Sequence, residues 1–300
     1  MVAPRQLSGP RVASPVRATL GEGLCWSPRE QALWSVDILE HRLYRDTPTG
    51  EHLEWRFDET VSAVAERARG PGLALALRHG LALFDPGSGR VDRFPPPAEE
   101  AAHPGNRFND GKCDARGRFW AGSMDFACRA PTGAYYRHDA EGRAVRALDA
   151  RWIVTNGPTW SLDGRTIFLN DTVHRRVVAC DFDMDSGRIG AARDWLVLPE
   201  AEGHPDGMTT DAEGRLWLAH WGGACVTCHD PGSARELLRI ALPTDHVSNV
   251  CFGGPGLRTL FVTTARVDLS PAQLAAQPLA GATFAIDVDA EGLPAHLFAG

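Results

Sequence analysis

Gly203-His204-Pro205-Asp206-Gly207-Met208 and the segment behind it, residues 211–220 (DAEGRLWLAH), form the stretch of sequence that decides the fold. Proline fixes one backbone angle and glycine frees the next, so this turn aims the side chain of Asp206 in one direction. The following segment reads as an Asp-x-x-Gly turn and then an alternating strand. The stretch therefore predicts a turn that presents one carboxylate, followed by antiparallel strands.

The same unit recurs along the whole chain. Its copies open at Glu22, Val64, Asn109, Asn156, Asp206 and Asn249. The steps between these positions are 42, 45, 47, 50 and 43 residues, within the range of about 40–50 residues that is typical of β-propeller blades. We see no segment with a sustained helical period. The sequence therefore predicts an all-β protein, a six-bladed β-propeller that forms a single domain over residues 1–300.

A propeller must close its ring, and an N-terminal strand can complete the last blade. Residues 13–20 (ASPVRATL) are placed to do this, and we expect about the first 12 residues to be loosely held. The insert at 268–278 (DLSPAQLAAQP) is polar and bounded by proline. It is predicted to be a loop or a short helix within the sixth blade.

Composition excludes several classes of partner. The formal net charge of the 300 residues is -7, and charges of both signs are scattered without a basic block, so nucleic acid and anionic membranes are poor partners. No apolar run is long enough to span a membrane, and the N-terminus shows no signal peptide. Seven dispersed cysteines fit reduced thiols better than a disulfide framework. We expect a cytoplasmic protein that is a monomer or a weak homo-oligomer.

The pair Cys225 and Cys228 forms a Cys-x-x-Cys motif, which can bind zinc or carry out redox chemistry. Here the motif lies in a predicted strand, where positions i and i+3 point to opposite faces. No second such motif follows at zinc spacing. We interpret the pair as two strand cysteines.

Blade symmetry predicts a metal site. Equivalent positions of successive blades converge around one end of the channel, which would bring Glu22, Asn156 and Asp206 together. Two carboxylates and an amide oxygen suit calcium, magnesium or manganese, and zinc can be accommodated. Three protein ligands also leave positions open for water and substrate. The alternative is that Asn156 and Asp206 are ordinary turn residues before glycine. Glu22 between two glycines does not fit that alternative, and the shared phase favours one divalent cation.

Several phrases in the sequence together resemble the SMP-30/gluconolactonase family, which includes regucalcin and sugar-acid lactonases. The resemblance covers residues from about 18 to 290. The phrases are Gly21-Glu22-Gly23 with Trp26, residues 107–112 (RFNDGK), residues 117–124 (GRFWAGSM), Asn156-Gly157 with residues 160–164 (WSLDG), Pro205-Asp206-Gly207 with residues 211–217 (DAEGRLW), and residues 221–223 (WGG).

This resemblance implies a propeller with one divalent cation on Glu22, Asn156 and Asp206. It further implies that Arg107, Asn109 and Asp110 bind the substrate, and that the activity is hydrolysis of an aldonolactone related to gluconolactone, xylonolactone or arabinonolactone. Our hypothesis for the reaction makes Asp206 both a metal ligand and the general base.

One departure concerns the residues after Met124. Some animal members carry several acidic residues there that reach the substrate, whereas only Asp125 is acidic in residues 125–128 (DFAC). Asp125 is therefore a candidate substrate contact.

Other functions stay open at this point. No Gly-x-Ser-x-Gly motif supports a serine esterase. His204 either lines the site or lies in a surface loop. The alternatives to a lactonase are a metal-dependent esterase or phosphotriesterase, a calcium-binding regulatory protein without turnover, and a propeller that serves as an interaction scaffold.

Overall fold

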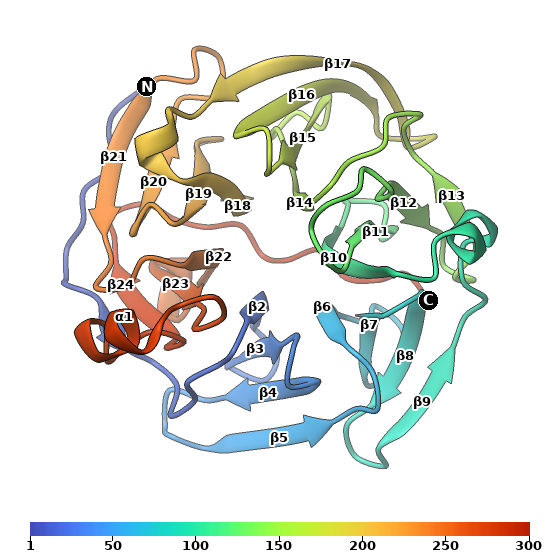
Figure 1. Cartoon of the computed structure of the whole chain (residues 1–300), viewed down its shortest axis with the longest axis horizontal. Coiled ribbons are helices and arrows are strands. Elements are labelled where there is room, and N and C mark those ends of the chain that lie inside the picture. Colours follow the sequence, from blue (N-terminus) through green and yellow to red (C-terminus); the bar gives the residue numbers. More distant parts are fainter.

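The computed structural model describes residues 1–300 as a ring of six four-stranded antiparallel sheets (Figure 1). In each sheet the strands follow one another from the channel outward. From the inner to the outer edge, the strands are β2 (Gly21–Ser27), β3 (Ala32–Asp37), β4 (Arg42–Asp46) and β5 (His52–Arg56) in blade one; β6 (Val61–Glu66), β7 (Leu73–Leu77), β8 (Leu81–Asp85) and β9 (Arg90–Arg93) in blade two; β10 (Asn106–Cys113), β11 (Phe119–Asp125), β12 (Tyr135–His138) and β13 (Ala144–Arg146) in blade three; β14 (Thr155–Trp160), β15 (Thr166–Asp171), β16 (Arg176–Asp183) and β17 (Arg188–Val197) in blade four; β18 (His204–Thr210), β19 (Leu216–Trp221), β20 (Cys225–His229) and β21 (Glu236–Ala241) in blade five; and β22 (Val247–Gly253), β23 (Thr259–Thr264), β24 (Phe284–Asp287) and β1 (Arg11–Val12) in blade six. The predicted six-bladed propeller is confirmed.

The ring is closed by the N-terminus, as predicted, but by a different segment. Strand β1 (Arg11–Val12) pairs with β24, whereas the prediction placed the closing strand within residues 13–20. The preceding residues also differ from the expectation of a loose end. Gln6 pairs with Val288, and Arg5 forms an ion pair of 2.7 Å with Asp289. The free edge of β24 offers unpaired backbone groups, and the N-terminal segment satisfies them.

Helices are few. The single α-helix, α1 (Pro271–Ala276), lies inside the insert expected to be a loop or short helix, and Ser270 and Gln273 form a capping box at its start. Three short 3-10 helices are η1 (Ala98–Ala102), η2 (Glu200–Glu202) and η3 (Pro255–Leu257). None of these helices has the length and hydropathy needed to cross a membrane.

Apolar side chains fill the spaces between blades. Trp217 of blade five packs with Phe252 and Val262 of blade six in one cluster, and Trp34 of blade one packs with Leu75 of blade two in another. The cysteines belong largely to this buried interior: all seven are free, and only Cys128 is exposed. Cys225 and Cys228 both lie in β20, which confirms their interpretation as strand cysteines.

Every innermost strand carries a break in its pairing register, and these breaks aim the channel side chains. The shifts lie between Glu22 and Cys25, Val61 and Ala63, Phe108 and Gly111, Asn156 and Thr159, Pro205 and Met208, and Val247 and Asn249. A β-bulge of this kind bends the strand and redirects a side chain. The polar opening residues of the repeat therefore sit where the inner strands turn their side chains toward the axis.

Candidate active site

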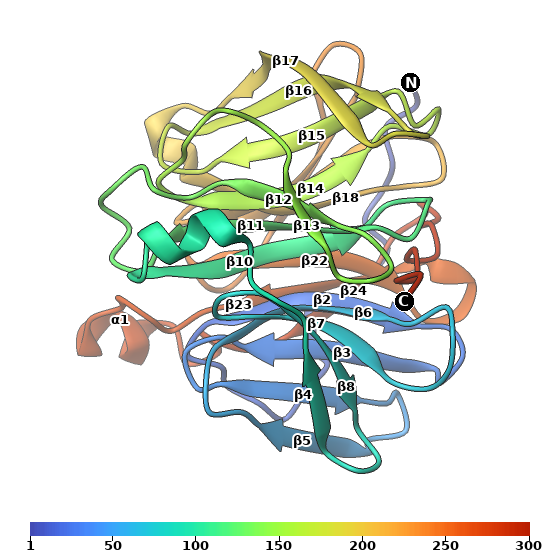
Figure 2. The same cartoon turned by 90° about the vertical axis from the view of Figure 1, so that its right-hand side faces the viewer.

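A cavity of about 480 Å³ occupies one end of the channel. Glu22, Arg107, Asn109, Asn156 and Asp206 all line it, so four inner strands bring five of the seven predicted site residues together. The cavity also includes Asp268 from the insert that contains α1. It therefore opens at the end of the propeller from which α1 projects, opposite the end where the C-terminus lies (Figure 2).

Glu22 reaches this cavity from β2 and is almost fully buried, with 4% of its surface exposed. Its Oε2 accepts a hydrogen bond of 2.8 Å from the Nδ2 of Asn249. Burial, and then the charge of Asp110, raises the pKa of Glu22 to about 8. A carboxylate held this way favours any partner that supplies positive charge.

Asp206 faces Glu22 from β18. Its Oδ1 is buried and has no hydrogen-bond partner, which is costly for a polar atom in a folded protein. Burial raises the pKa of Asp206, and the charge of Glu22 raises it further. Glycine is required at the next position, because a Cβ on Gly207 would lie 2.6 Å from the Cγ of Asn249.

Asn156 supplies the amide. Its Oδ1 accepts a hydrogen bond of 2.8 Å from the Nδ2 of Asn109, and its own Nδ2 donates to the Oγ1 of Thr172 at 3.0 Å. Asn109 also donates to the carbonyl of Thr155 at 2.8 Å. Because these bonds fix both amides, the oxygen of Asn156 keeps one orientation toward the cavity.

Arg107 is the only arginine or lysine in the wall. Its Nη1 donates to the Oδ1 of Asn109 at 2.5 Å and to the carbonyl of Phe108 at 3.0 Å, while its Nε is buried without a partner. The guanidinium carbon lies 5.6 Å from the centre of the Phe126 ring, a cation–π distance. Arg107 thus retains a donor for a bound molecule.

Asp110 and Asp125, the other two predicted site residues, do not line the cavity. Asp110 is buried and accepts hydrogen bonds from the backbone N–H groups of Gly111 (2.8 Å) and Gly157 (3.1 Å). Its carboxylate therefore fixes the backbone next to Asn156.

Asp125 differs from the expected substrate contact. Its carboxylate accepts hydrogen bonds from the backbone N–H groups of Ala130 (2.8 Å), Arg129 (2.9 Å) and Ala127 (3.2 Å). These bonds, that of Ala130 most strongly, lower the pKa of Asp125. The carboxylate shapes the loop that follows it, and this loop places Phe126 and Cys128 in the cavity wall.

Sequence reasoning missed part of the wall. His204, left open between the site and a surface loop, lines the cavity, and its Nδ1 lies 2.9 Å from the carbonyl oxygen of Thr172. Trp221 also lines it and stacks on His246 at 4.2 Å between ring centres. Trp221 is part of the family motif at residues 221–223, but no function was predicted for it. Asp268 lies in an insert outside the repeat, so its place in the cavity could not be predicted from equivalent positions of the blades.

The residues present fit a divalent cation. The set combines two buried carboxylates of raised pKa with an oriented amide oxygen, and one carboxylate oxygen of Asp206 has no partner within the protein. No group of three or more His, Cys, Asp or Glu side chains is arranged to hold a metal ion. The proposed ligand set therefore depends on an amide as its third member, an oxygen donor that calcium accepts readily.

Fold and cavity together define a class: a six-bladed propeller with a carboxylate-lined site at one end of its channel. Residues 20–266 match the family model described as the SMP-30/Gluconolactonase/LRE-like region. The chain belongs to this family.

Its relatives carry names of two kinds. The chain is 33% identical to regucalcin of Gallus gallus, covering 95% of this chain and 96% of the relative. It is 34% identical to L-arabinolactonase of Azospirillum brasilense, covering 95% and 93%. Among solved structures, the calcium-binding protein regucalcin from Agrobacterium tumefaciens has a TM-score of 0.89 at 27% identity, over 97% of each chain.

Proposed function

We propose that this protein is a divalent-metal-dependent sugar lactonase that hydrolyses an aldonolactone to the aldonic acid. The substrate would be related to gluconolactone, xylonolactone or arabinonolactone. Support comes from the family and from relatives named L-arabinolactonase and pentonolactonase, each 34% identical to this chain. The observation that carries the proposal is the joint presence of Glu22, Asn156, Asp206 and Arg107 in one cavity.

Glu22, Asn156 and Asp206 would hold the cation, which when bound supplies a Lewis acid for the carbonyl oxygen and lowers the pKa of water. Asp206 has two carboxylate oxygens, and the one that does not bind the cation could accept the proton of the attacking water. Water adds to the acyl carbon, the ring C–O bond breaks, and the proton passes to the leaving oxygen.

Arg107 and the apolar wall would position the lactone. The free Nε of Arg107 can donate to a substrate hydroxyl. Trp221 and Phe126 provide flat apolar surfaces against which the C–H groups of a sugar ring can pack. Orientation of this kind is worth a large part of a hydrolytic barrier.

A pH-indicator assay on glucono-, xylono- and arabinonolactone, with and without chelator, tests the proposal. We expect hydrolysis that chelator abolishes and that an added divalent cation restores. The variants Asp206→Ala and Glu22→Ala should lack this activity, whereas Asp181→Asn, a change at an exposed position of β16, should keep it. Activity of either alanine variant in chelator at the normal rate would contradict the proposal.

A second candidate is a calcium-binding regulatory protein, which the relatives named regucalcin favour. Stoichiometric metal binding without turnover of any ester would support this candidate instead. A metal-dependent esterase or phosphotriesterase would hydrolyse aryl esters or phosphotriesters faster than any lactone in the same assay.

A further inference from the structure

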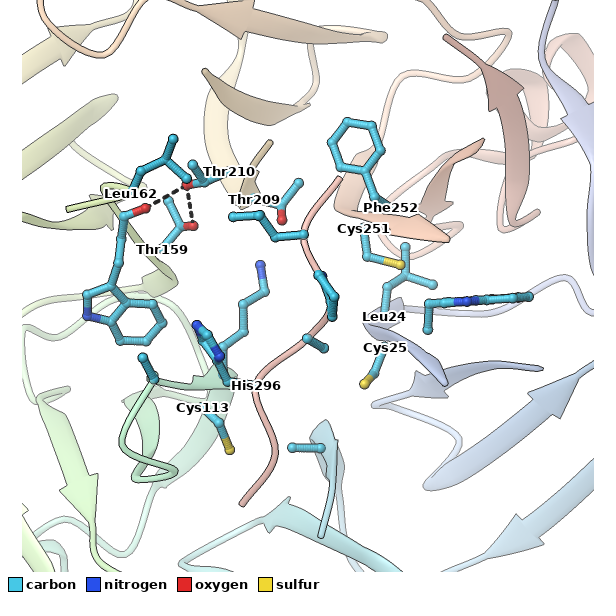
Figure 3. Close-up of a pocket in the computed structure, with 18 of the residues that line it drawn as sticks. Leu24, Cys25, Cys113, Thr159, Leu162, Thr209, Thr210, Cys251, Phe252 and His296 are labelled. Carbon is cyan, nitrogen blue, oxygen red and sulfur yellow. Dashed lines mark hydrogen bonds between the residues drawn. The ribbon is translucent and has the colours of Figure 1, made fainter. Parts of the chain in front are cut away.

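Figure 3 shows a second cavity, of about 330 Å³. Its lining includes residues 293–296 of the C-terminal segment, so it lies at the opposite end of the channel. It is separate from the candidate active site and shares no lining residue with it. The continuations of the same inner strands form its walls, and the C-terminal segment crosses it. Nothing in the proposed lactonase reaction uses this cavity.

Its walls are mainly apolar. Leu24, Trp26, Leu162 and Phe252 contribute large side chains. Three buried thiols, of Cys25, Cys113 and Cys251, also line it. Burial raises the pKa of each thiol, so at neutral pH they are uncharged and act as small apolar groups.

One charge stands out among these groups. Lys112 lines the cavity. It is the only lysine of the chain, since the other 30 of its 31 Lys and Arg residues are arginines. A lysine offers a compact ammonium with three donors, which arginine cannot reproduce. One donor bonds to the carbonyl of Met208.

The ammonium of Lys112 forms no direct ion pair, but it acts at longer range on Asp110, where burial raises the pKa and the charge of Lys112 opposes that rise. It takes part in none of the ion pairs of the structure. Two carboxylates close to the walls are already paired, Glu66 with Arg29 at 3.1 Å and Asp114 with Arg118 at 2.6 Å. A half-buried ammonium without a direct ion pair, facing an apolar cavity, is complementary to an anion that brings its own apolar body.

A ligand could enter this cavity past the C-terminal segment that crosses it. Residues 293–297 cross it and make no backbone hydrogen bond, whereas both flanks are anchored. On one side Gly292 donates to the carbonyl of Leu257 at 2.8 Å, and on the other Phe298 donates to the carbonyl of Glu66 at 2.8 Å. A segment held only at its ends can be displaced without breaking a sheet.

We propose that this second cavity binds a small monocarboxylate with an aromatic or branched aliphatic body, its carboxylate on Lys112 and its body among the apolar walls. A charge-assisted hydrogen bond to the ammonium would fix the polar end. The cavity volume suits an acid of about the size of phenylacetate, since ligand sites are mostly apolar with few polar groups. The site is independent of the proposed lactonase activity.

The single lysine gives the proposal a direct test. Protein labelled with ¹³C-lysine shows one side-chain signal, that of Lys112, which we would follow while titrating sodium phenylacetate. We expect a saturable shift, and no saturable shift with the neutral isostere phenylacetamide. Slower acylation of Lys112 in the native protein by an amine-reactive ester in the presence of phenylacetate would agree.

Two variants decide between the cavities. Binding of phenylacetate, measured by calorimetry, should be lost in Lys112→Met. It should be kept in Arg107→Met, which removes the guanidinium group of the other cavity. Binding that is lost only in Arg107→Met would overturn the proposal. So would equal binding of the amide, or no saturable shift of the native protein up to the solubility limit of phenylacetate. The lysine signal and the acylation rate come from the native chain, so the outcome does not depend on whether Lys112→Met folds.

Discussion

The carboxylate of Asp206 is buried in a place that is unfavourable for the metal-free protein and favourable for binding a cation. Its Oδ1 is buried without a hydrogen bond, and Glu22 and Asp110 both add negative charge nearby. In the metal-free protein this arrangement is unfavourable, because buried like charges without partners destabilise the folded state. A bound cation would reverse the sign of the interaction, which supports our proposal that the site binds an ion.

A first prediction follows for Asp206→Asn, which keeps the shape and removes the charge. Activity should fall by about 10²–10⁴ in kcat/KM, because the general base is lost. The unfolding midpoint of the metal-free protein should nevertheless rise by about 2–4 °C, because the folded state no longer has to protonate this buried carboxyl group or hold its charge beside Glu22. Lactone hydrolysis and thermal unfolding in chelator measure the two effects. A clear drop in the metal-free midpoint would contradict this view of the site.

Some features of the site could be predicted from the sequence, and others could not. Glu22, Asn156 and Asp206 share one phase of the repeat, so their convergence could be predicted from spacing. The commitment of Asp125 to three backbone N–H groups could not, since it depends on the path of a loop. The hydrogen bond that Asn249 of the adjacent blade six donates to Glu22 could be expected only from their shared phase.

At the scale of elements, the Asp-x-x-Gly turn has a second function besides reversing the chain. In blade five the Oδ2 of Asp211 accepts hydrogen bonds from the Nε1 of Trp217 (2.9 Å) and the Nε of Arg215 (2.6 Å). The equivalent group in blade three makes the same bonds, and its members are Asp114, Arg118 and Trp120. The turn, the buried arginine and the core tryptophan thus form one unit.

Removal of the carboxylate from this unit should be costly. We predict that Asp211→Ala destabilises the protein by about 3–5 kcal/mol, because Arg215 would remain buried with only the exposed Glu213 as an ionic partner. The matched control is Asp163→Ala in blade four, where the carboxylate is exposed and bonds to Ser161 at 2.6 Å. That change should cost less than about 1 kcal/mol. Denaturant unfolding of both variants checks the difference, and equal costs would refute it.

The bulges of the inner strands mark the limit of sequence reasoning at this scale. The alternation of apolar and polar residues in the strands and the turn residues between them could be recognised in the sequence, so the number of blades was predictable. A bulge is an extra residue relative to the partner strand, and a single sequence does not show the pairing from which it is counted. The closing strand was misplaced for a related reason, because β1 has only two residues and no alternation to reveal it.

At the scale of the whole molecule, ring closure depends on the N-terminal segment. Deletion of residues 1–12 would remove β1 and leave β24 as an open edge. We predict a lower unfolding midpoint and concentration-dependent association of the truncated protein, measured by thermal unfolding and light scattering. Deletion of residues 1–4, which precede the first bonds to blade six, is the control. A truncated protein as stable and monodisperse as the full chain would show that β1 is dispensable.

Buried histidines should make the molecule sensitive to acid. Burial lowers the pKa of His138 and of His220 to about 4, whereas both have ordinary values near about 6.5 when unfolded. Between these pH values the unfolded chain binds more protons, so the free energy of unfolding decreases as pH falls from about 6.5 to about 4. Unfolding in denaturant at pH 7 and pH 5 should show the loss, and His220→Gln should reduce it. An unchanged slope in this variant would place the acid sensitivity elsewhere.

The central claim is that Glu22, Asn156 and Asp206, from three different blades, bind one divalent cation. Calorimetric titration of the chelator-treated protein with calcium, manganese and zinc, backed by elemental analysis, tests it most directly. We expect one ion per chain at this site and loss of that ion in Glu22→Gln, Asn156→Leu and Asp206→Asn alike. Retention of one tightly bound ion in all three variants would contradict it.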